Sequence, residues 1–160
     1  MRRYVTELQP RNSRTWYGDK TDGKNRVKSV FLAGTIDMGN SVDWQKEIVK
    51  DIRDNWNQSI SYIVYNPRRD EKFEDDVHEL RYQIEWELNN LENCDTIIMY
   101  IAGSSKSPIT LMELGLYAAS GKLVVICEEN FYRFENVRAV CKRYDVEFFT
   151  NMTDFCKDWI

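Results

Sequence analysis

The chain has 160 residues, of which 42% are hydrophobic and 30% are charged, and its formal net charge is −4. This composition is ordinary for a single globular domain with a full core, and the acidic balance argues against a general nucleic-acid binder. No apolar run approaches the length that crosses a bilayer, so we expect no membrane partner.

Cysteine and histidine usage narrows the class of protein further. The four cysteines form no Cys-x-x-Cys pair, which is typical of reduced thiols in a cytoplasmic protein. The single histidine, His78, gives little basis for a histidine metal site or a histidine-dependent catalytic pair. The residues after Met1 form no signal-peptide core. We therefore expect a cytoplasmic protein that needs no metal and no organic cofactor.

The N-terminal region differs in charge from the rest of the chain. Residues 1–26 hold seven Lys or Arg against three acidic residues and show no apolar periodicity. This pattern predicts a basic, loosely ordered arm ahead of a single domain at 27–160. A contact of the arm with phosphate or with an acidic neighbour is the alternative.

From residue 27 onward, short apolar runs alternate with helical patterns. In chain order we predict a strand at 27–33, a helix at 43–56, a strand at 61–65, a helix at 74–93, a strand at 96–101, a helix at 108–120, a strand at 123–126, a helix at 136–144, a strand at 146–149 and a helix at 152–159. Spacing places one set of apolar residues on one side of the 74–93 helix: Val77, Leu80, Ile84, Leu88 and Leu91. Strict alternation with apolar strands predicts an α/β fold, a five-stranded doubly wound parallel sheet with helices on both faces.

Ligands of such folds bind beyond the carboxyl ends of the strands, which selects the loops after residues 33, 65, 101 and 126. In the first loop, Gly34 permits close backbone approach to a ligand, and Thr35 and Asp37 follow it. A flexible strand-to-helix connection is the alternative for this loop. Trp44, at the start of the next helix, is a candidate for stacking on a base or for simple packing.

The second and third loops supply polar candidates. Asn66, Arg68 and Arg69 follow the 61–65 strand, and paired arginines hold phosphate or carboxylate well, although surface arginines are common. Ser107 begins the 108–120 helix, where it suits an anion or sugar hydroxyls but also serves as a plain N-cap.

Two acidic residues are the candidate catalytic groups. Glu113 is the only charged residue in the 108–120 helix, which is otherwise apolar on every side, and such a carboxylate is costly unless it is paired or has a shifted pKa. A structural hydrogen bond is the alternative explanation. Glu87 borders the apolar stripe of the 74–93 helix, and two carboxylates at one cleft can act as nucleophile and general acid.

Three sequence blocks resemble one known family. They are Phe-Leu-Ala-Gly at 31–34, Asn-Cys-Asp-Thr-Ile at 93–97, and Met-Glu-Leu-Gly-Leu-Tyr-Ala at 112–118 followed by Gly-Lys at 121–122. From about residue 28 to 140 the chain resembles the nucleoside 2-deoxyribosyltransferases and related N-glycosidases. The resemblance implies a flavodoxin-like fold, a small nucleoside or nucleotide substrate, and a homo-oligomer.

The resemblance also implies roles for particular residues. Glu113 matches the residue that attacks C1′ of the sugar, and Glu87 matches the acid that serves the leaving base. Asn136 roughly matches an asparagine that a neighbouring subunit contributes to the site. Ser107 stands where the family has Asp, which leaves open whether the reaction is transfer between bases or hydrolysis.

The mechanism expected from these roles has Glu113 ionised and Glu87 protonated. Tyr100, at the end of the 96–101 strand, could donate a hydrogen bond to Glu113, and a half-buried strand aromatic is the alternative. The alternatives for the whole protein are a hydrolase of nucleoside 5′-monophosphates, an idle nucleotide-binding module, and an interaction protein that uses the basic arm.

Overall fold

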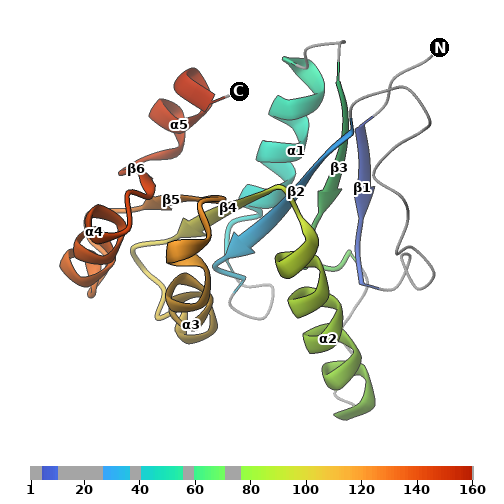
Figure 1. Cartoon of the computed structure of the whole chain (residues 1–160), viewed down its shortest axis with the longest axis horizontal. Coiled ribbons are helices and arrows are strands. Elements are labelled where there is room, and N and C mark those ends of the chain that lie inside the picture. Colours follow the sequence, from blue (N-terminus) through green and yellow to red (C-terminus); the bar gives the residue numbers. More distant parts are fainter. Residues whose placement is uncertain (1–4, 11–26, 37–40, 56–59, 71–76, 160) are drawn as a thin grey trace.

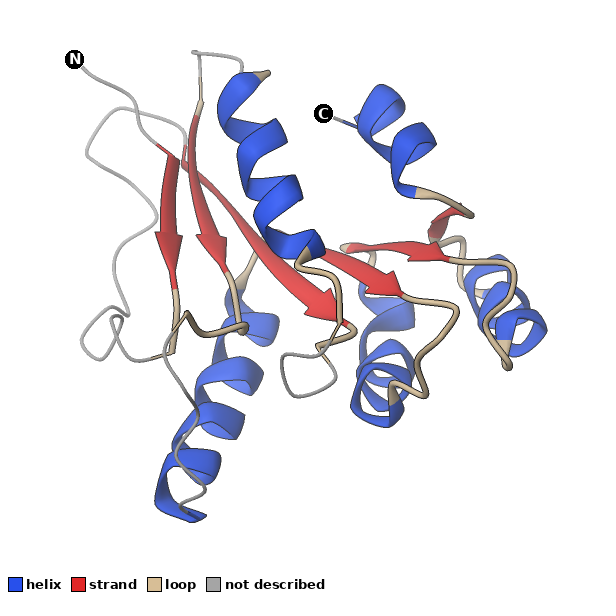
Figure 2. Cartoon of the chain, turned by 180° about the vertical axis from the view of Figure 1, so that it is seen from behind, coloured by secondary structure: helices blue, strands red, loops and turns tan. Residues whose placement is uncertain are grey.

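The computed structural model describes residues 5–10, 27–36, 41–55, 60–70 and 77–159. Its sheet has six parallel strands in the order β1-β3-β2-β4-β5-β6 (Figures 1 and 2). The strands are β1 (Val5–Leu8), β2 (Val27–Gly34), β3 (Ser61–Tyr65), β4 (Thr96–Ile101), β5 (Leu123–Cys127) and β6 (Glu147–Phe149). The helices are α1 (Trp44–Asp54), α2 (Val77–Asn93), α3 (Pro108–Tyr117) with a short 3-10 turn at Ala118–Ser120, α4 (Phe134–Arg143) and α5 (Met152–Trp159).

The strand count corrects the sequence prediction of five. The additional strand, β1, has only four half-buried residues and pairs with β3 at the edge of the sheet. A short edge strand buries little apolar surface, so its sequence carries little periodic signal. The polar residues 11–26 of the predicted arm, together with Asp37, lie outside the described residues.

Helices cover both faces of the sheet, as the alternation predicts (Figure 1). One core cluster joins the sheet to α1 and α5, and includes Trp44, Ile48 and Phe155. The other joins it to α2, α3 and α4, and includes Trp86, Leu114 and Val137. Among the described helices, none has the length and apolar character needed to span a membrane.

The strand order reverses at β2. From this strand the chain crosses through α1 to β3 on one side, and then returns through α2 to β4 on the other side. The carboxyl ends of β2 and β4 are therefore the topological switch point of the sheet. Gly34 ends β2 with φ of +134°, and a Cβ there would lie 2.0 Å from the Tyr100 carbonyl oxygen. The glycine is therefore required by its close approach to β4.

The apolar stripe of α2 faces outward, in contrast to an ordinary surface helix. Trp86 and Leu91 are the buried residues of this helix, and Trp86 packs against Phe31 and Tyr65. Four stripe residues are instead exposed: Val77, Leu80, Ile84 and Leu88. At the end of the helix, the Lys122 ammonium donates hydrogen bonds to the carbonyls of Leu91, Glu92 and Cys94, which satisfies terminal acceptors that the helix leaves open.

Candidate active site

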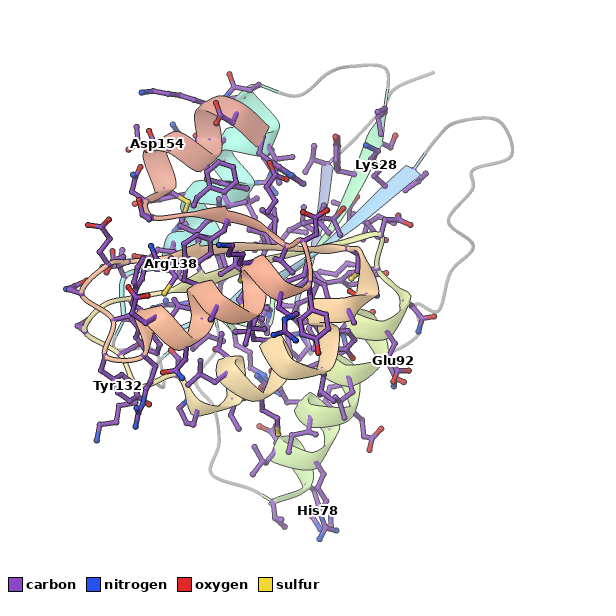
Figure 3. All side chains as sticks on the ribbon, turned by 60° about the vertical axis from the view of Figure 1, so that its left-hand side comes forward. Lys28, His78, Glu92, Tyr132, Arg138 and Asp154 are labelled. Atoms are coloured by element: carbon purple, nitrogen blue, oxygen red, sulfur yellow. The ribbon has the colours of Figure 1, made fainter. Side chains whose placement is uncertain are left out.

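Glu113 is a buried residue of α3. This helix lies in the same layer as α2 (Figures 1 and 3). It is 7% exposed, and its helix neighbours Thr110, Leu114 and Tyr117 are also buried. Among the described residues, no side chain or backbone N–H donates a hydrogen bond to its carboxylate. Burial in this setting, together with the charge of Glu87, raises the pKa of Glu113 to about 8.

Glu87 has a more polar environment than Glu113. Burial raises its pKa, but the Gln83 side chain donates a 2.8 Å hydrogen bond to Glu87 Oε1, and the Arg69 guanidinium lowers the pKa as well. Arg69 also forms an ion pair of 3.2 Å with Glu79. Because Glu87 has a hydrogen-bond donor and a nearby guanidinium, and Glu113 has neither among the described residues, a proton shared by the pair favours Glu113. This is the reverse of the proton assignment expected from the sequence.

Gln83 is a member of this site that the sequence analysis missed. It precedes Glu87 by four residues, and side chains at that spacing meet on the surface of a helix. That spacing was therefore a signal available in the sequence, since a glutamine one turn before a half-buried acid can donate to it.

Three buried hydroxyls meet at the switch point, between the ends of β2 and β4. Thr35 Oγ1 lies 2.7 Å from Ser107 Oγ and 3.1 Å from Ser105 Oγ, and the two serine oxygens are 2.7 Å apart. The Ala102 backbone N–H donates to Thr35 Oγ1 as well. Ser105 is another residue that the sequence analysis did not select.

Ser107 is the N-cap residue of α3 by position, but its side chain makes no capping hydrogen bond. Its φ of 45° lies in the left-handed region, which is unusual for a residue with a Cβ. The conformation turns its hydroxyl toward Thr35 and Ser105. These contacts tie the start of the helix that carries Glu113 to the end of β2.

Trp44 and Asn66, two of the residues predicted to bind substrate, make contacts within the chain. Trp44 is buried, packs on Tyr100 with ring centroids 5.3 Å apart, and donates from Nε1 to the Thr35 carbonyl. Asn66 is buried, and its side chain donates to Glu7 Oε1 and accepts from the Arg68 backbone N–H.

Arg68 is also engaged within the chain. Its guanidinium donates to the carbonyls of Ser41 and Val42 and lies 3.8 Å from Asp43 Oδ2. These contacts hold the segment before α1 against the loop after β3. The structure therefore separates Arg68 from Arg69, which faces the acids of α2.

Tyr100 differs from the sequence expectation. Its hydroxyl donates a 2.7 Å hydrogen bond to Glu128 Oε1, and its ring belongs to the cluster under α1. Burial and the neighbouring Glu128 raise the pKa of Tyr100 well above its usual range. The structure thus brings the Tyr100 hydroxyl to Glu128, on the face of the sheet opposite to α3, and not to Glu113.

Asn136 lies on α4 and lines a hollow of about 310 Å³ with Leu111, Leu114, Gly115 and Arg133 among others. At 100° per residue, Gly115 is about 200° around the helix from Glu113. The hollow is therefore on the far side of α3 from the Glu113 carboxylate of the same chain. In the described part of the chain, no group of three or more His, Cys, Asp or Glu residues could hold a metal ion.

The comparisons with known proteins identify the family and the fold of the chain. The family model described as "Nucleoside 2-deoxyribosyltransferase like" matches residues 27–131, which is more than half of the chain. Among solved structures, the chain is similar to a conserved protein from Enterococcus faecalis V583, with 12% identity and a TM-score of 0.55. That alignment covers 82% of this chain and 96% of the other, and it shows a common fold. No match was found among curated proteins.

Proposed function

Because the chain belongs to the nucleoside 2-deoxyribosyltransferase-like family, we propose that it cleaves or transfers the N-glycosidic bond of a nucleoside or nucleotide. The observation that carries the proposal is the Glu87–Glu113 pair. Glu113 is buried and Glu87 is half-buried, the two are coupled electrostatically, and they come from neighbouring helices within the matched region. Environments that push two acids away from their usual pKa are typical of glycosidic catalysis.

In the first step, a Glu113 carboxylate oxygen attacks C1′ of the sugar. The bond between C1′ and the base nitrogen breaks, its electron pair stays with the base, and Glu87 donates a proton to the base. The product is a glycosyl ester on Glu113, formed through an oxocarbenium-like transition state.

In the second step, water or a second base attacks C1′ and releases Glu113 as a carboxylate. Glu87, now ionised, accepts the proton from the attacking group. Hydrolysis needs water alone, whereas transfer needs an acceptor base.

The proton positions in the free protein bear on this scheme. A singly protonated pair satisfies the scheme in number, but in the absence of substrate its proton favours Glu113. The reactive arrangement has the same overall charge with that proton on Glu87, so substrate binding has only to change which acid holds it.

The second candidate function is that of a non-catalytic nucleotide-binding module with the same fold. The observation that favours this alternative is the low exposure of Glu113. The side chain is 7% exposed, and a sugar must reach its carboxylate before any reaction can occur. For the enzyme, contacts of Gly34, Thr35, Asp37, Trp44, Asn66 and Ser107 with substrate stay predictions.

The test is incubation of the protein with a panel of deoxynucleosides and their 5′-monophosphates, followed by chromatography for free base. Base release that is lost in Glu113→Ala, in a variant that remains folded by circular dichroism, supports the covalent scheme. Unchanged release in Glu113→Ala would contradict it. Tight binding of a nucleotide without release by the parent protein would favour the module.

The same assay separates the narrower alternatives. Release that needs an added acceptor base indicates a transferase, and release without one indicates a hydrolase. If a 5′-phosphate is bound at the loop after β3, Arg68→Ala should weaken nucleotides more than nucleosides. Equal losses would count against a phosphate role and fit the loop-holding contacts of Arg68.

A further inference from the structure

The side-chain amide of Gln83 has partners for its nitrogen but not for its oxygen. Nε2 donates a 2.8 Å hydrogen bond to Glu87 Oε1 and a 3.3 Å hydrogen bond to the Pro67 carbonyl. Oε1 is buried, and no described residue donates to it. A buried acceptor without a donor is costly, because it has lost its hydrogen bonds to water and gained none in exchange. In a candidate active site, such an atom points to a donor that arrives with a ligand.

The partners of Gln83 determine which way its amide faces. The Pro67 carbonyl can only accept a hydrogen bond, and an ionised Glu87 also only accepts. A rotated amide would place Oε1 against these two acceptors and would lose both hydrogen bonds. Because the Pro67 carbonyl carries no proton in any state, it favours the same orientation when Glu87 is protonated. The chain therefore holds Gln83 Oε1 in place as an acceptor.

Gln83 Oε1 lies close to the acid that is proposed to protonate the base. The oxygen and nitrogen of one amide are about 2.2 Å apart, so Gln83 Oε1 is within roughly 5 Å of Glu87 Oε1. The two side chains are one helical turn apart on the same side of α2. The hydrogen bond to Pro67, two residues beyond the end of β3, places Gln83 beside the edge of the sheet where ligands of such folds bind.

Glu87 and Gln83 together present one donor and one acceptor. Glu87 Oε1 already accepts from Gln83, so a proton on this acid is favoured on its other oxygen. That O–H group donates, and Gln83 Oε1 accepts. A complementary base therefore has an acceptor at the atom that is protonated and an N–H donor next to it.

Bases differ in whether they carry this pattern. Adenine has it in N7 and the 6-amino group, whereas guanine has two acceptors, N7 and O6, on the same edge. Hypoxanthine has the same two acceptors as guanine. Thymine and uracil have the complementary pattern in O2 and the adjacent N3–H. The O6 atom of hypoxanthine would face Gln83 Oε1 with no proton between the two oxygens, which leaves both without a partner.

We propose that Gln83 is a specificity-determining residue, which selects bases that carry an N–H donor beside the atom that Glu87 protonates. The inference rests on the proposed function for the placement of the base against Glu87. It adds the recognition of one edge of the base, which the reaction itself does not require. Recognition is measured as binding and the reaction as release of base, so the two can fail separately.

The test is calorimetric titration of Glu113→Gln with 2′-deoxyadenosine and 2′-deoxyinosine, each also as its 5′-monophosphate. This variant forms no glycosyl ester, so the nucleosides stay intact during the measurement. 2′-Deoxyadenosine should bind roughly 10- to 100-fold tighter, the range expected for one well-placed contact to a base edge. For pyrimidines the pair is 2′-deoxyuridine and the 2′-deoxynucleoside of pyrimidin-2-one, whose N3 carries no proton.

Two further variants in the same background isolate the acceptor. Gln83→Met keeps the length of the side chain and removes Oε1, so the two members of each pair should bind about equally. Loss of the donor to Glu87 affects both members alike and cancels in their ratio. The matched control is Gln45→Met, because Gln45 is fully buried and its amide also lacks a partner among the described residues. It lies on α1, which packs on the face of the sheet opposite to α2, so the preference should be unchanged.

A preference for the donor-bearing base that is lost in Gln83→Met and kept in Gln45→Met supports the assignment, with circular dichroism as the check on folding. Equal binding within each pair that binds, or tighter binding of 2′-deoxyinosine, would overturn it. A preference that persists in Gln83→Met would overturn it as well, and so would a protein that binds no member of either pair. The expected preference in a protein whose parent releases no base would support the recognition and count against the reaction.

Discussion

Two carboxylates close to the ligand edge of the sheet, Glu113 and Glu128, have opposite environments. Glu128 accepts hydrogen bonds from the Tyr100 hydroxyl at 2.7 Å and from the Gly103 backbone N–H at 2.6 Å. Glu113 is buried beside another acid, and no described residue donates to it. Glu128 is half-buried, and a hydrogen-bond donor satisfies each of its carboxylate oxygens, so its position needs no functional explanation. Glu113 is a candidate for chemistry because it is buried without compensating donors among the described residues. Burial of its charged form without donors lowers the free energy of unfolding.

The largest expected effect is on catalysis by Glu113 itself. Glu113→Gln keeps the size of the side chain but cannot form the glycosyl ester, so base release should fall by roughly 10³-fold or more. The exposed Glu129→Gln variant, chosen as a control, should keep the parent rate. If Glu113→Gln keeps most of the activity, Glu113 is not the nucleophile, and it no longer differs in role from Glu128.

The pH dependence tests how the pair shares its proton. If the reactive form holds one proton on Glu87, kcat/KM should fall tenfold per pH unit above about 8, where the pair loses that proton. In Glu87→Gln the neighbouring charge is gone, which lowers the pKa of Glu113. The slower variant should then show a rate that rises with pH to a plateau reached below pH 8. A parent rate that rises through pH 8 would show that Glu87 is not the acid.

Stability should depend on pH through the same group. The folded protein keeps a proton on Glu113 up to about pH 8, whereas the unfolded chain releases it near the ordinary value of 4.5. The free energy of unfolding should therefore fall between about pH 5 and pH 8, by up to a few kcal/mol, and Glu113→Gln should remove this fall. Urea unfolding of both proteins across this range measures it. Parallel pH profiles for the two would contradict the raised pKa.

A smaller effect is expected at Glu128. Glu128→Ala leaves the Tyr100 hydroxyl and the Gly103 N–H without their acceptor, which should cost about 1–3 kcal/mol of unfolding free energy. Urea unfolding measures the loss. A stability equal to that of the parent would mean that Glu128 is not a structural acid.

The smallest effect is expected for Tyr100→Phe. Loss of its single hydrogen bond should lower the free energy of unfolding by about 1 kcal/mol, and base release should stay within a few-fold of the parent rate. A large loss of kcat without a loss of stability would contradict this expectation and would support Tyr100 as a hydrogen-bond donor to Glu113.

Much of the fold follows from patterns that the sequence shows directly. The five runs predicted as strands from residue 27 onward became β2 to β6. The apolar signal is strongest in strands buried on both faces, such as β4 and β5, and weaker in the edge strand β6, where Glu147 is exposed. The edge strand β1 was missed because four half-buried residues carry little signal. The apolar residues of α2 have helical spacing, but spacing alone does not say which side of the helix faces the sheet. In the structure Trp86 packs on the sheet, against Phe31.

The sequence was enough to select the acidic residues of the candidate site, but not the residues that contact its members. Glu113 stands out because it is the only charge in an apolar helix, and burial bears out its unusual setting. Tyr100 alternates to the other face of the sheet from Met99 and Ile101, and its partner Glu128 is 28 residues away in the chain. The hydroxyl cluster likewise depends on Ser107 in a left-handed conformation, which no local pattern indicates.

The most direct measurement is the intact mass of the protein after reaction with a nucleoside that carries fluorine at C2′. The fluorine withdraws electrons from the sugar and slows resolution of the ester, so the intermediate should accumulate. We expect one added sugar on the chain, located by peptide mapping at Glu113 and absent from Glu113→Gln. Steady release of base from an unmodified chain, or a sugar attached at any other residue, would contradict the proposal that Glu113 forms a covalent bond to C1′.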